Sequence, residues 1–385
     1  MNKKIFIVAG EASGDLHGAD LARALRTLDP EVTLIGMGGE QMRQAGVTLI
    51  VDARELAVVG VTEVLSRLTA LLRAFGRLRT SLKAEAPGLL VLIDFPDFNF
   101  WLARAARRLG IAVLYYIGPQ VWAWRRGRLR TLKRLVEKML VLFPFEEAVY
   151  REAGIPVACV GHPMLDRLRG VPTKEEARRL LGHSGSEVIV GLLPGSREGE
   201  VRHHLPVLKQ AVDQMGTVEP RIRFLVAVAD TLPPGLVETL LQGSGPAIRL
   251  VRGQTYQVMR AADLVITASG TATLEAGLLG TPMVIVYRVS LLTWWAGKLL
   301  VDVPSIGMVN LVVGRRVVPE LLQWEFTPNR VAETALGLVR DPAALDRIRQ
   351  ELREVRGRLG EEGASRRAAQ EILTMVYERG AGSSR

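Results

Sequence analysis

The fold is decided by Leu264-Val-Ile266, then Ala268-Ser-Gly-Thr-Ala-Thr-Leu-Glu275, then Ala276-Gly-Leu-Leu279. The apolar run predicts a buried strand, and the small polar residues after it predict a tight turn that opens a helix. Gly270 would let backbone amides approach a ligand, and the helix N-terminus favours a phosphate. Ser269 and Thr271 add hydroxyls there, and Glu275 suits the hydroxyls of a ribose. Any α/β protein needs such turns, so this motif alone leaves a purely structural role open.

A second turn of the same kind is Gly191-Leu-Leu-Pro-Gly-Ser-Arg197-Glu-Gly-Glu200, which follows the apolar residues 188–190. A helix is expected from about Val201. Two such turns in one half of the chain can converge on a diphosphate, with Gly195 and Ser196 at the closest approach. The guanidinium of Arg197 suits a two-point grip on phosphate oxygens, although a lone loop arginine is more often simply solvated.

Length and composition are typical of a globular protein with two domains. The chain has 385 residues, of which 48% are hydrophobic and 23% charged. Two domains of about 170–190 residues would each bury a core. Cys159 is the single cysteine, which excludes an intrachain disulfide and indicates a reducing compartment.

The N-terminal apolar run, residues 5–9, is too short for a signal peptide, and no stretch reaches the ~18 apolar residues of a spanning helix. We therefore expect a soluble, cytoplasmic protein that meets a membrane only from its surface. The net charge of +10 favours an anionic partner. Nucleic acid is the weaker candidate, because the sequence has no helix-turn-helix, zinc-ligand or aromatic RNA-binding motif.

Residues 63–83 place apolar side chains, including Leu68, Leu72 and Phe75, on one helical face with arginines outside it. The common explanation is a helix packed on a sheet. A membrane contact is favoured because four of the six tryptophans lie in two other stretches with basic residues, as expected at a lipid headgroup boundary. These four tryptophans are Trp122, Trp124, Trp294 and Trp295.

The chain alternates strand and helix patterns in two series. Strands are expected at 4–9, 32–36, 88–93, 111–116 and 138–142, and again at 187–193, 222–228, 247–251, 263–267 and 282–286, with helices between them, the first near 16–27. We expect domains at 1–165 and 172–340, and a charged helical C-terminal segment at 342–385.

The first strand ends at Gly10-Glu-Ala-Ser-Gly-Asp15. A dinucleotide cofactor would need Gly-x-Gly-x-x-Gly here, and carboxylates would repel a pyrophosphate. Glu11 and Ser13 suit sugar hydroxyls better, so this end is expected to bind an acceptor. Two Rossmann-like domains that face each other across a cleft, with phosphate motifs in the second, are typical of a nucleotide-sugar glycosyltransferase.

Seven blocks, in order, resemble those of the lipid-A-disaccharide synthase family. They are Gly10–Asp15, Asp94-Phe-Pro-Asp97-Phe-Asn99, Gly118-Pro-Gln-Val-Trp-Ala-Trp124, Gly161-His-Pro163, Leu193–Arg197, Ala268–Glu275 and Val318-Pro-Glu-Leu-Leu-Gln323. One block departs from the family, which usually has Leu-Pro-Asn where this chain has Met308-Val-Asn310; Asn310 is kept as a donor-site residue.

The resemblance implies an inverting hexosyltransferase of the α/β GT-B fold, part of lipopolysaccharide biosynthesis. Its substrates would be UDP-diacylglucosamine and diacylglucosamine 1-phosphate, and its products UDP and the β-1,6 lipid A disaccharide 1-phosphate. Asp97 matches the proposed base, although an aspartate there can also cap a helix. No Asp-x-Asp triplet is present, so neither a metal nor another cofactor is expected. The protein would associate peripherally with the anionic inner-membrane surface, and a homo-oligomer is left open.

Two other classes remain open. Another UDP-sugar enzyme of the same fold, such as a peptidoglycan glycosyltransferase or a UDP-N-acetylglucosamine epimerase, would keep the second-domain site and lack the tryptophan-rich patches. A membrane-surface scaffold could bind a nucleotide sugar without turnover, which the combination of Asp97, Arg197 and Glu275 argues against.

Overall fold

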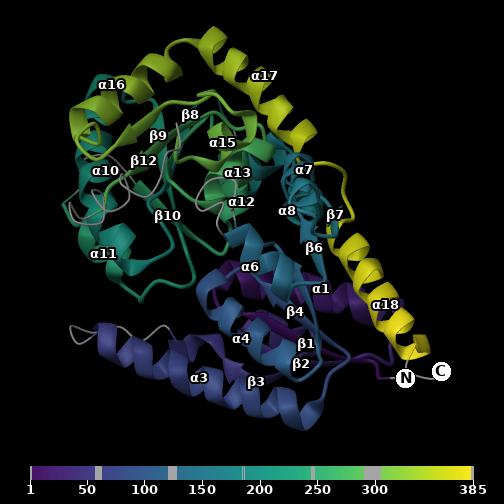
Figure 1. Cartoon of the computed structure of the whole chain (residues 1–385). Coiled ribbons are helices and arrows are strands. Elements are labelled where there is room, and N and C mark those ends of the chain that lie inside the picture. The colour runs from purple at the N-terminus through teal and green to yellow at the C-terminus, as the bar shows by residue number, and fades with distance from the viewer. Residues whose placement is uncertain are drawn as a thin grey trace. The chain divides into compact units, whose positions relative to one another are not determined.

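The computed structural model describes residues 2–56, 63–119, 128–183, 185, 187–243, 248–289 and 305–382. The chain divides into two compact units (Figure 1). Unit 1 comprises Met1–Arg167 with Leu359–Arg385, and unit 2 comprises Leu168–Arg358. Each unit has its own parallel sheet and its own hydrophobic core.

Unit 1 has a seven-stranded sheet in the order β3-β2-β1-β4-β5-β6-β7, in which all described pairs are parallel. Its elements are β1 (Lys4–Ala9), α1 (Ala12–Leu28), β2 (Thr33–Gly38), α2 (Glu40–Gln44), β3 (Thr48–Asp52), the 3-10 helix η1 (Ala53–Leu56), α3 (Glu63–Glu85), β4 (Leu89–Ile93), α4 (Pro96–Arg108), β5 (Ala112–Tyr116), α6 (Arg128–Leu135), β6 (Lys138–Val141), α7 (Pro144–Glu152), β7 (Val157–Cys159), α8 (Met164–Arg167) and α18 (Ala364–Gly382).

Unit 2 has a six-stranded parallel sheet in the order β10-β9-β8-β11-β12-β13. Its elements are η2 (Leu168–Gly170), α9 (Lys174–Leu180), β8 (Val188–Leu193), α10 (Glu198–Val218), β9 (Ile222–Val228), α11 (Leu236–Leu241), β10 (Ile248–Arg252), α12 (Thr255–Ala261), β11 (Leu264–Ala268), α13 (Thr271–Leu278), β12 (Met283–Tyr287), α15 (Met308–Val313), β13 (Glu320–Leu322), α16 (Pro328–Val339) and α17 (Pro342–Arg358).

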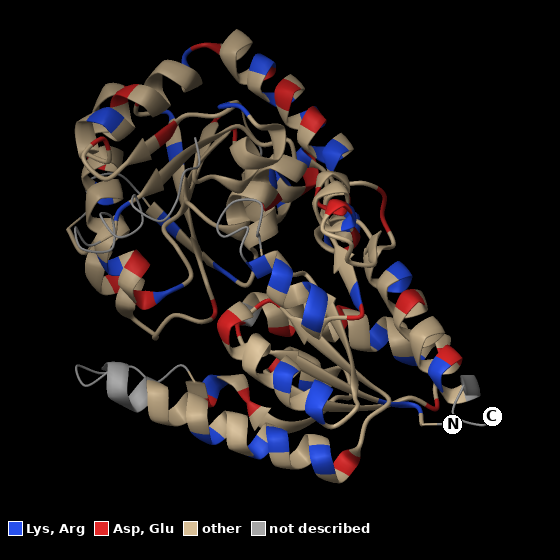
Figure 2. Cartoon of the chain, in the orientation of Figure 1, with Lys and Arg blue, Asp and Glu red and all other residues tan. Residues whose placement is uncertain are grey.

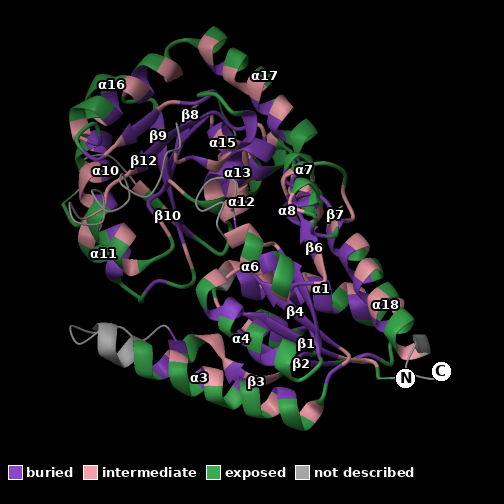
Figure 3. Ribbon diagram, viewed as in Figure 1, coloured by how far each residue is buried: buried purple, intermediate pink, exposed green. Residues whose placement is uncertain are grey.

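The central strands are continuous apolar runs because helices cover both faces of a parallel sheet. All five residues of β4 and of β11 are buried, whereas the outer faces of the helices are exposed (Figure 3). This burial supplies the main stabilising free energy of each unit, about 1.5–3 kcal/mol for each large apolar side chain.

The predicted class, two α/β domains with parallel sheets, is confirmed. All ten predicted strands are present. The strands β3, β7 and β13 were not predicted from the sequence, and β7 and β13 have only three residues each. Helix α1 begins at Ala12 rather than near residue 16. A helix start is hard to place here because the N-cap residue, Glu11, makes no side-chain capping bond.

The C-terminal segment is divided between the units. Helix α17 buries Leu345, Leu352 and Val355 and contacts α13 and α15 of unit 2, whereas α18 packs on α1 of unit 1. Tyr377 of α18 also donates its hydroxyl proton to Asp29 at 2.7 Å. The sequence predicts residues 342–385 as one segment, because its charge pattern does not reveal which sheet each helix covers. None of the described helices is long and apolar enough to span a bilayer.

One half-buried carboxylate ties the start of unit 2 together. Asp263, just before β11, pairs with Lys174 and Arg178 of α9, in each case at 2.6 Å. It also accepts a hydrogen bond from the backbone N–H of Ile189 in β8 at 2.9 Å. One side chain thus joins α9, β8 and β11.

Asp263→Ala should lower the free energy of unfolding of unit 2 by about 1–3 kcal/mol, because it leaves Arg178 and a backbone donor without their acceptor. Asp346→Ala is the matched control, since Asp346 pairs with Arg349 on the exposed face of α17, and should cost less than about 0.5 kcal/mol. Urea unfolding followed by circular dichroism measures both. Equal losses would show that the Asp263 network adds nothing beyond a surface ion pair.

Candidate functional site

The candidate donor site lies where the strand order of unit 2 reverses. Strand β8 pairs with β9 on one side and with β11 on the other, so the loops after β8 and β11 leave a crevice at the carboxyl ends of the strands. A pocket of about 270 Å³ lies there. It is lined by the loops after β8, β9 and β11 and by the first residues of α12 and α13.

Most of the donor-site residues selected from the sequence line this pocket. They are Gly195, Ser196, Arg197, Ser269, Gly270, Thr271 and Glu275. Gly270 has a φ of 152°, which other residues rarely adopt, and a Cβ added there would meet no atom of the surrounding residues within 4 Å. The turn therefore presents open space in front of the N-terminus of α13, where unpaired N–H groups favour an anion.

The loop after β8 is held by a buried histidine. His204 of α10 donates from Nδ1 to the carbonyl oxygen of Pro194 at 2.8 Å, while its Nε2 accepts from the N–H of Arg288 at 3.1 Å. These partners require the neutral tautomer with the proton on Nδ1, and burial lowers the pKa of the ring. The loop position is thereby fixed.

The carboxylate of Glu200 accepts hydrogen bonds from the groups of this loop that could otherwise bind an anion. Its Oε2 accepts from the backbone N–H of Ser196 at 3.2 Å and of Arg197 at 3.4 Å, and its Oε1 pairs with the Arg197 guanidinium at 3.1 Å. A Cβ on Gly195 would approach Oε2 of Glu200 to 2.7 Å. Glu200 was not among the residues selected from the sequence, although its spacing from Arg197 is that of a helix-capping glutamate.

Glu275 and Asn310 differ in their surroundings. Oε1 of Glu275 accepts from the hydroxyl of Tyr256 at 2.8 Å at the pocket wall. Asn310 is buried and does not line the pocket; its amide binds the backbone of Val317 and Val318 and the carboxylate of Glu320. The geometry thus gives Asn310 a structural position behind the site. Val309 lies in the first turn of α15, where a proline would also fit.

In unit 1 the strand order reverses between β1 and β4, and two carboxylates follow these strands. Glu11 follows β1, and Asp94 follows β4. Asp94 and Phe95 both have φ of 48°, an unusual conformation for residues other than glycine. The carbonyl oxygen of Asp94 accepts from Tyr115 at 2.7 Å and from Asn99 at 2.6 Å, which fixes this turn.

Burial, and next the nearby negative charge of Glu11, raises the pKa of the Asp94 carboxyl. The sequence position of Asp94, just before a helix, is that of a cap or orienting group. The structure places Phe95 at the N-cap, without a side-chain bond. A perturbed carboxyl at a switch point on a strained turn has the features of a functional group.

The other selected residues of unit 1 lie around this turn. Asp97 is in the first turn of α4, with its side chain 80% exposed and paired with Arg128 at 2.6 Å. Ser13 is half-buried at the start of α1. Asp15 instead accepts from the backbone N–H groups of Gly39, Gln41 and Met42, so it caps α2 rather than facing a ligand.

The expected membrane contacts are only partly described. Leu68 and Leu72 of α3 are 48% and 53% exposed, and Phe75 is half-buried. Trp122, Trp124, Trp294 and Trp295 lie outside the described residues. Within the described part of the chain, no cluster of three or more His, Cys, Asp or Glu side chains is placed to hold a metal ion.

Solved structures that match nearly the whole chain include an epimerase and a glycosyltransferase. A UDP-N-acetylglucosamine 2-epimerase from Neisseria meningitidis, bound to UDP-N-acetylglucosamine, matches with a TM-score of 0.58 and 14% identity, over 97% of this chain and 100% of that one. The calicheamicin glycosyltransferase CalG4 matches with a TM-score of 0.61 and 15% identity, over 97% and 98%. The fold is thus that of the GT-B class.

Sequence comparison defines the family within that class. Residues 5–375 match the family model described as lipid-A-disaccharide synthetase. The lipid-A-disaccharide synthase of Geobacter sulfurreducens is 47% identical, over 97% of each chain, and that of Syntrophus aciditrophicus is 45% identical, over 98% of this chain and 99% of its own. The chain belongs to the lipid-A-disaccharide synthase family of glycosyltransferases.

Proposed function

We propose that the protein transfers 2,3-diacylglucosamine from UDP to the 6-hydroxyl of 2,3-diacylglucosamine 1-phosphate. The acceptor O6 forms a bond to C1 of the donor sugar, the bond from C1 to the diphosphate breaks with inversion, and a carboxylate takes the hydroxyl proton. The products are the β-1,6 lipid A disaccharide 1-phosphate and UDP. Family membership carries this proposal, and the anion-binding pocket of unit 2 supports it.

Mass spectrometry of the products formed from both diacylated substrates tests the proposal directly. A disaccharide 1-phosphate with release of UDP is the expected result. Epimerised UDP-sugar without a disaccharide would instead indicate the function of the structural neighbours. Binding of the nucleotide sugar without any product would indicate a scaffold.

We assign the donor to unit 2. Gly195, Ser196 and Arg197, with Ser269, Gly270 and Thr271 at the start of α13, would hold the diphosphate, and Glu275 would accept from the ribose hydroxyls. Asn310 would act indirectly, by holding the chain beside α15. Positive charge from Arg197 and α13 can stabilise the departing UDP, so the proposal includes no metal or other cofactor.

Arg197→Ala and Glu275→Ala should each weaken UDP binding by about 1–3 kcal/mol, as expected for a lost charged hydrogen bond. Arg202→Ala is the matched control on α10, because Arg202 pairs with Glu198 and does not line the pocket. Isothermal titration with UDP measures all three. Unchanged affinity in both pocket variants would move the donor site elsewhere.

Glu200→Gln should strengthen UDP binding by about threefold to tenfold, because a diphosphate must displace a carboxylate from the amides of Ser196 and Arg197 and a neutral amide competes less. Glu198→Gln, in the same helical turn, is the control and should leave the affinity within about twofold. Weaker UDP binding in Glu200→Gln would show that the carboxylate positions Arg197 for the ligand rather than competing with it.

We assign the acceptor to the switch point of unit 1, with Glu11 and Ser13 as contacts to sugar hydroxyls. The sequence selects Asp97 as the base, and the structure brings Asp94 forward as a second candidate. The raised pKa of Asp94 makes its carboxylate a stronger base than that of an ordinary aspartate. The hydrogen bond from Tyr115 to its carbonyl oxygen holds the turn in place. We propose Asp94 as the base, with the Asp97–Arg128 pair positioning the turn.

Asp94→Asn should lower kcat by about 10²–10⁴-fold with UDP affinity near wild type, because the amide keeps the shape and has no basic lone pair. Asp97→Asn is compared in parallel; if it causes the larger loss, Asp97 is the base. Glu11→Gln adds a second readout. It removes a negative neighbour, lowers the pKa of Asp94, and should move the acid limb of the kcat profile to lower pH. Melting temperatures control for folding.

We further propose that the protein is cytoplasmic and associates peripherally with the anionic inner membrane. The exposed leucines of α3, Leu68 and Leu72, support this location, because both proposed substrates carry acyl chains. Basic residues lie along α3 and also along α4, as Figure 2 shows. A surface of this composition attracts acidic lipids more strongly at low salt.

A further inference from the structure

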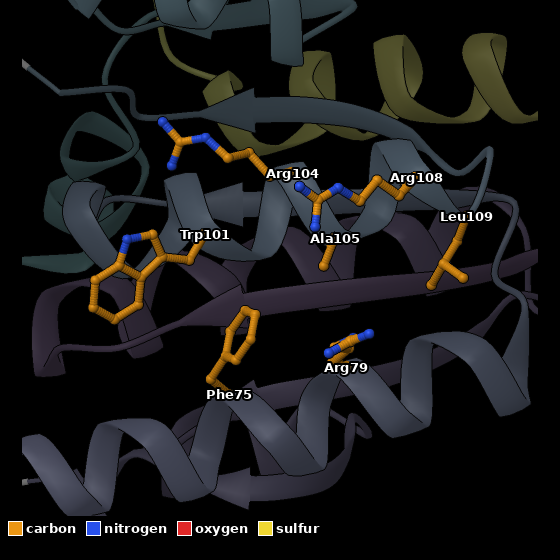
Figure 4. Close-up of a pocket in the computed structure, with 7 residues that line it drawn as sticks. All are labelled: Phe75, Arg79, Trp101, Arg104, Ala105, Arg108 and Leu109. Atoms are coloured by element: carbon orange, nitrogen blue, oxygen red, sulfur yellow. The ribbon is translucent and has the colours of Figure 1, made fainter.

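A second pocket, of about 280 Å³, lies in unit 1 between α3 and α4 (Figure 4). Helix α3 contributes Phe75 and Arg79, and α4 with the residue after it contributes Trp101, Arg104, Ala105, Arg108 and Leu109. Three of the seven lining residues are arginines and none is acidic. The proposed donor and acceptor groups do not use this pocket.

The arginines of this pocket differ from their neighbours on the same helices. Arg77 of α3 pairs with Glu55 at 2.8 Å, and Arg107 of α4 pairs with Glu137 at 2.7 Å. The side chains of Arg79, Arg104 and Arg108 are exposed, and their guanidinium groups have no ion-pair or hydrogen-bond partner among the residues that the structure describes. Gathered guanidinium groups without a carboxylate attract a multivalent anion, and phosphate fits their planar donors well.

The convergence of these charges is a tertiary feature. Arg108 in the last turn of α4 has a simple local explanation, since a cation there interacts favourably with the helix dipole. Arg79 has no such explanation, because it lies in α3 more than one turn before that helix ends at Glu85. In Figure 4, Arg79 lies on the side of α3 that faces α4, Arg108 runs along α4, and Arg104 extends away from α3.

The rest of the lining is apolar and partly exposed. The rings of Phe75 and Trp101 meet edge to face with their centroids 6.4 Å apart, and Trp101 and Leu109 are each 41% exposed. Leu68, Leu72, Phe75 and Arg79 recur every three or four residues, so they lie along one side of α3. A row of exposed leucines thus leads to the aromatic pair and then to the arginines.

We propose that this pocket binds the phosphate group of an anionic phospholipid, with the adjoining apolar part of the lipid against Phe75, Trp101 and the leucine row. The site rests on the membrane association proposed above and adds a discrete position where one headgroup is gripped. Charge complementarity selects an anion, and the continuous apolar row selects an amphiphile rather than a free ion.

The test uses the full chain and phosphatidylcholine vesicles with and without phosphatidylglycerol, with binding measured by flotation. Arg79→Gln/Arg108→Gln should reduce binding to the acidic vesicles by about 30-fold, as two basic groups at a membrane surface would. The control Arg77→Gln/Arg107→Gln removes the same charge from the same helices and should reduce binding by less than about threefold. Melting temperatures and UDP affinity show that each variant is folded.

Each outcome separates this site from the general membrane contact. Equal losses in the two double variants would overturn the pocket and leave a diffuse electrostatic attraction in place. Wild-type binding that is equal for acidic and neutral vesicles would overturn both proposals, while transfer assayed in detergent would still test the enzyme function.

The source of the phosphate is distinguished by calorimetric titration with short-chain lipids below their micelle concentration. Dihexanoyl phosphatidylglycerol should bind to wild type at least about tenfold more tightly than inorganic phosphate or dihexanoyl phosphatidylcholine, and the pocket variant should lose this preference. Inorganic phosphate that binds as tightly as the lipid would overturn the lipid assignment.

Discussion

Every proposed donor and acceptor group depends on one constraint, the reversal of strand order in each parallel sheet. Helices must leave in opposite directions on either side of the reversal, so the loops after the two adjoining strands separate and leave a crevice. In unit 2 these strands are β8 and β11, and in unit 1 they are β1 and β4. The loops with Arg197 and Gly270 follow the first pair, and those with Glu11 and Asp94 follow the second.

The two crevices have opposite electrostatic character. In unit 2, backbone N–H groups, a helix N-terminus and Arg197 favour an anion, and Glu200 supplies a carboxylate to these donors within the chain itself. This internal pair keeps the loop ordered and satisfies its donors. In unit 1, the carboxyl groups of Glu11 and Asp94 make the local electrostatic potential more negative. A negative potential suits removal of a proton from a hydroxyl and disfavours binding of a diphosphate. These opposite charges support the proposed division between a donor site and an acceptor site.

Burial distinguishes residues of one motif that look equivalent in sequence. Asp94 and Asp97 are three residues apart, yet Asp94 is held in a strained turn beside Glu11 and Asp97 is exposed and paired with Arg128. Asp15 and Asn310 look like ligand contacts and instead organise α2 and the chain around α15. In α3 and α4, ion pairing distinguishes Arg77 and Arg107, which each pair with a glutamate, from the arginines of the second pocket.

The sequence by itself determined the two parallel α/β domains, all of the central strands, and the loops that line the pocket of unit 2, because apolar runs and glycine-containing turns are local patterns. It also contained the blocks that identify the family. Short edge strands such as β7 and β13 escaped prediction, since three residues carry too little pattern. Only the tertiary structure decided which carboxyl has a raised pKa, that Glu200 reaches back to the loop before it, and that Arg79 and Arg108 line one pocket. These properties depend on which side chains the fold brings together, and on how far burial removes water from around them.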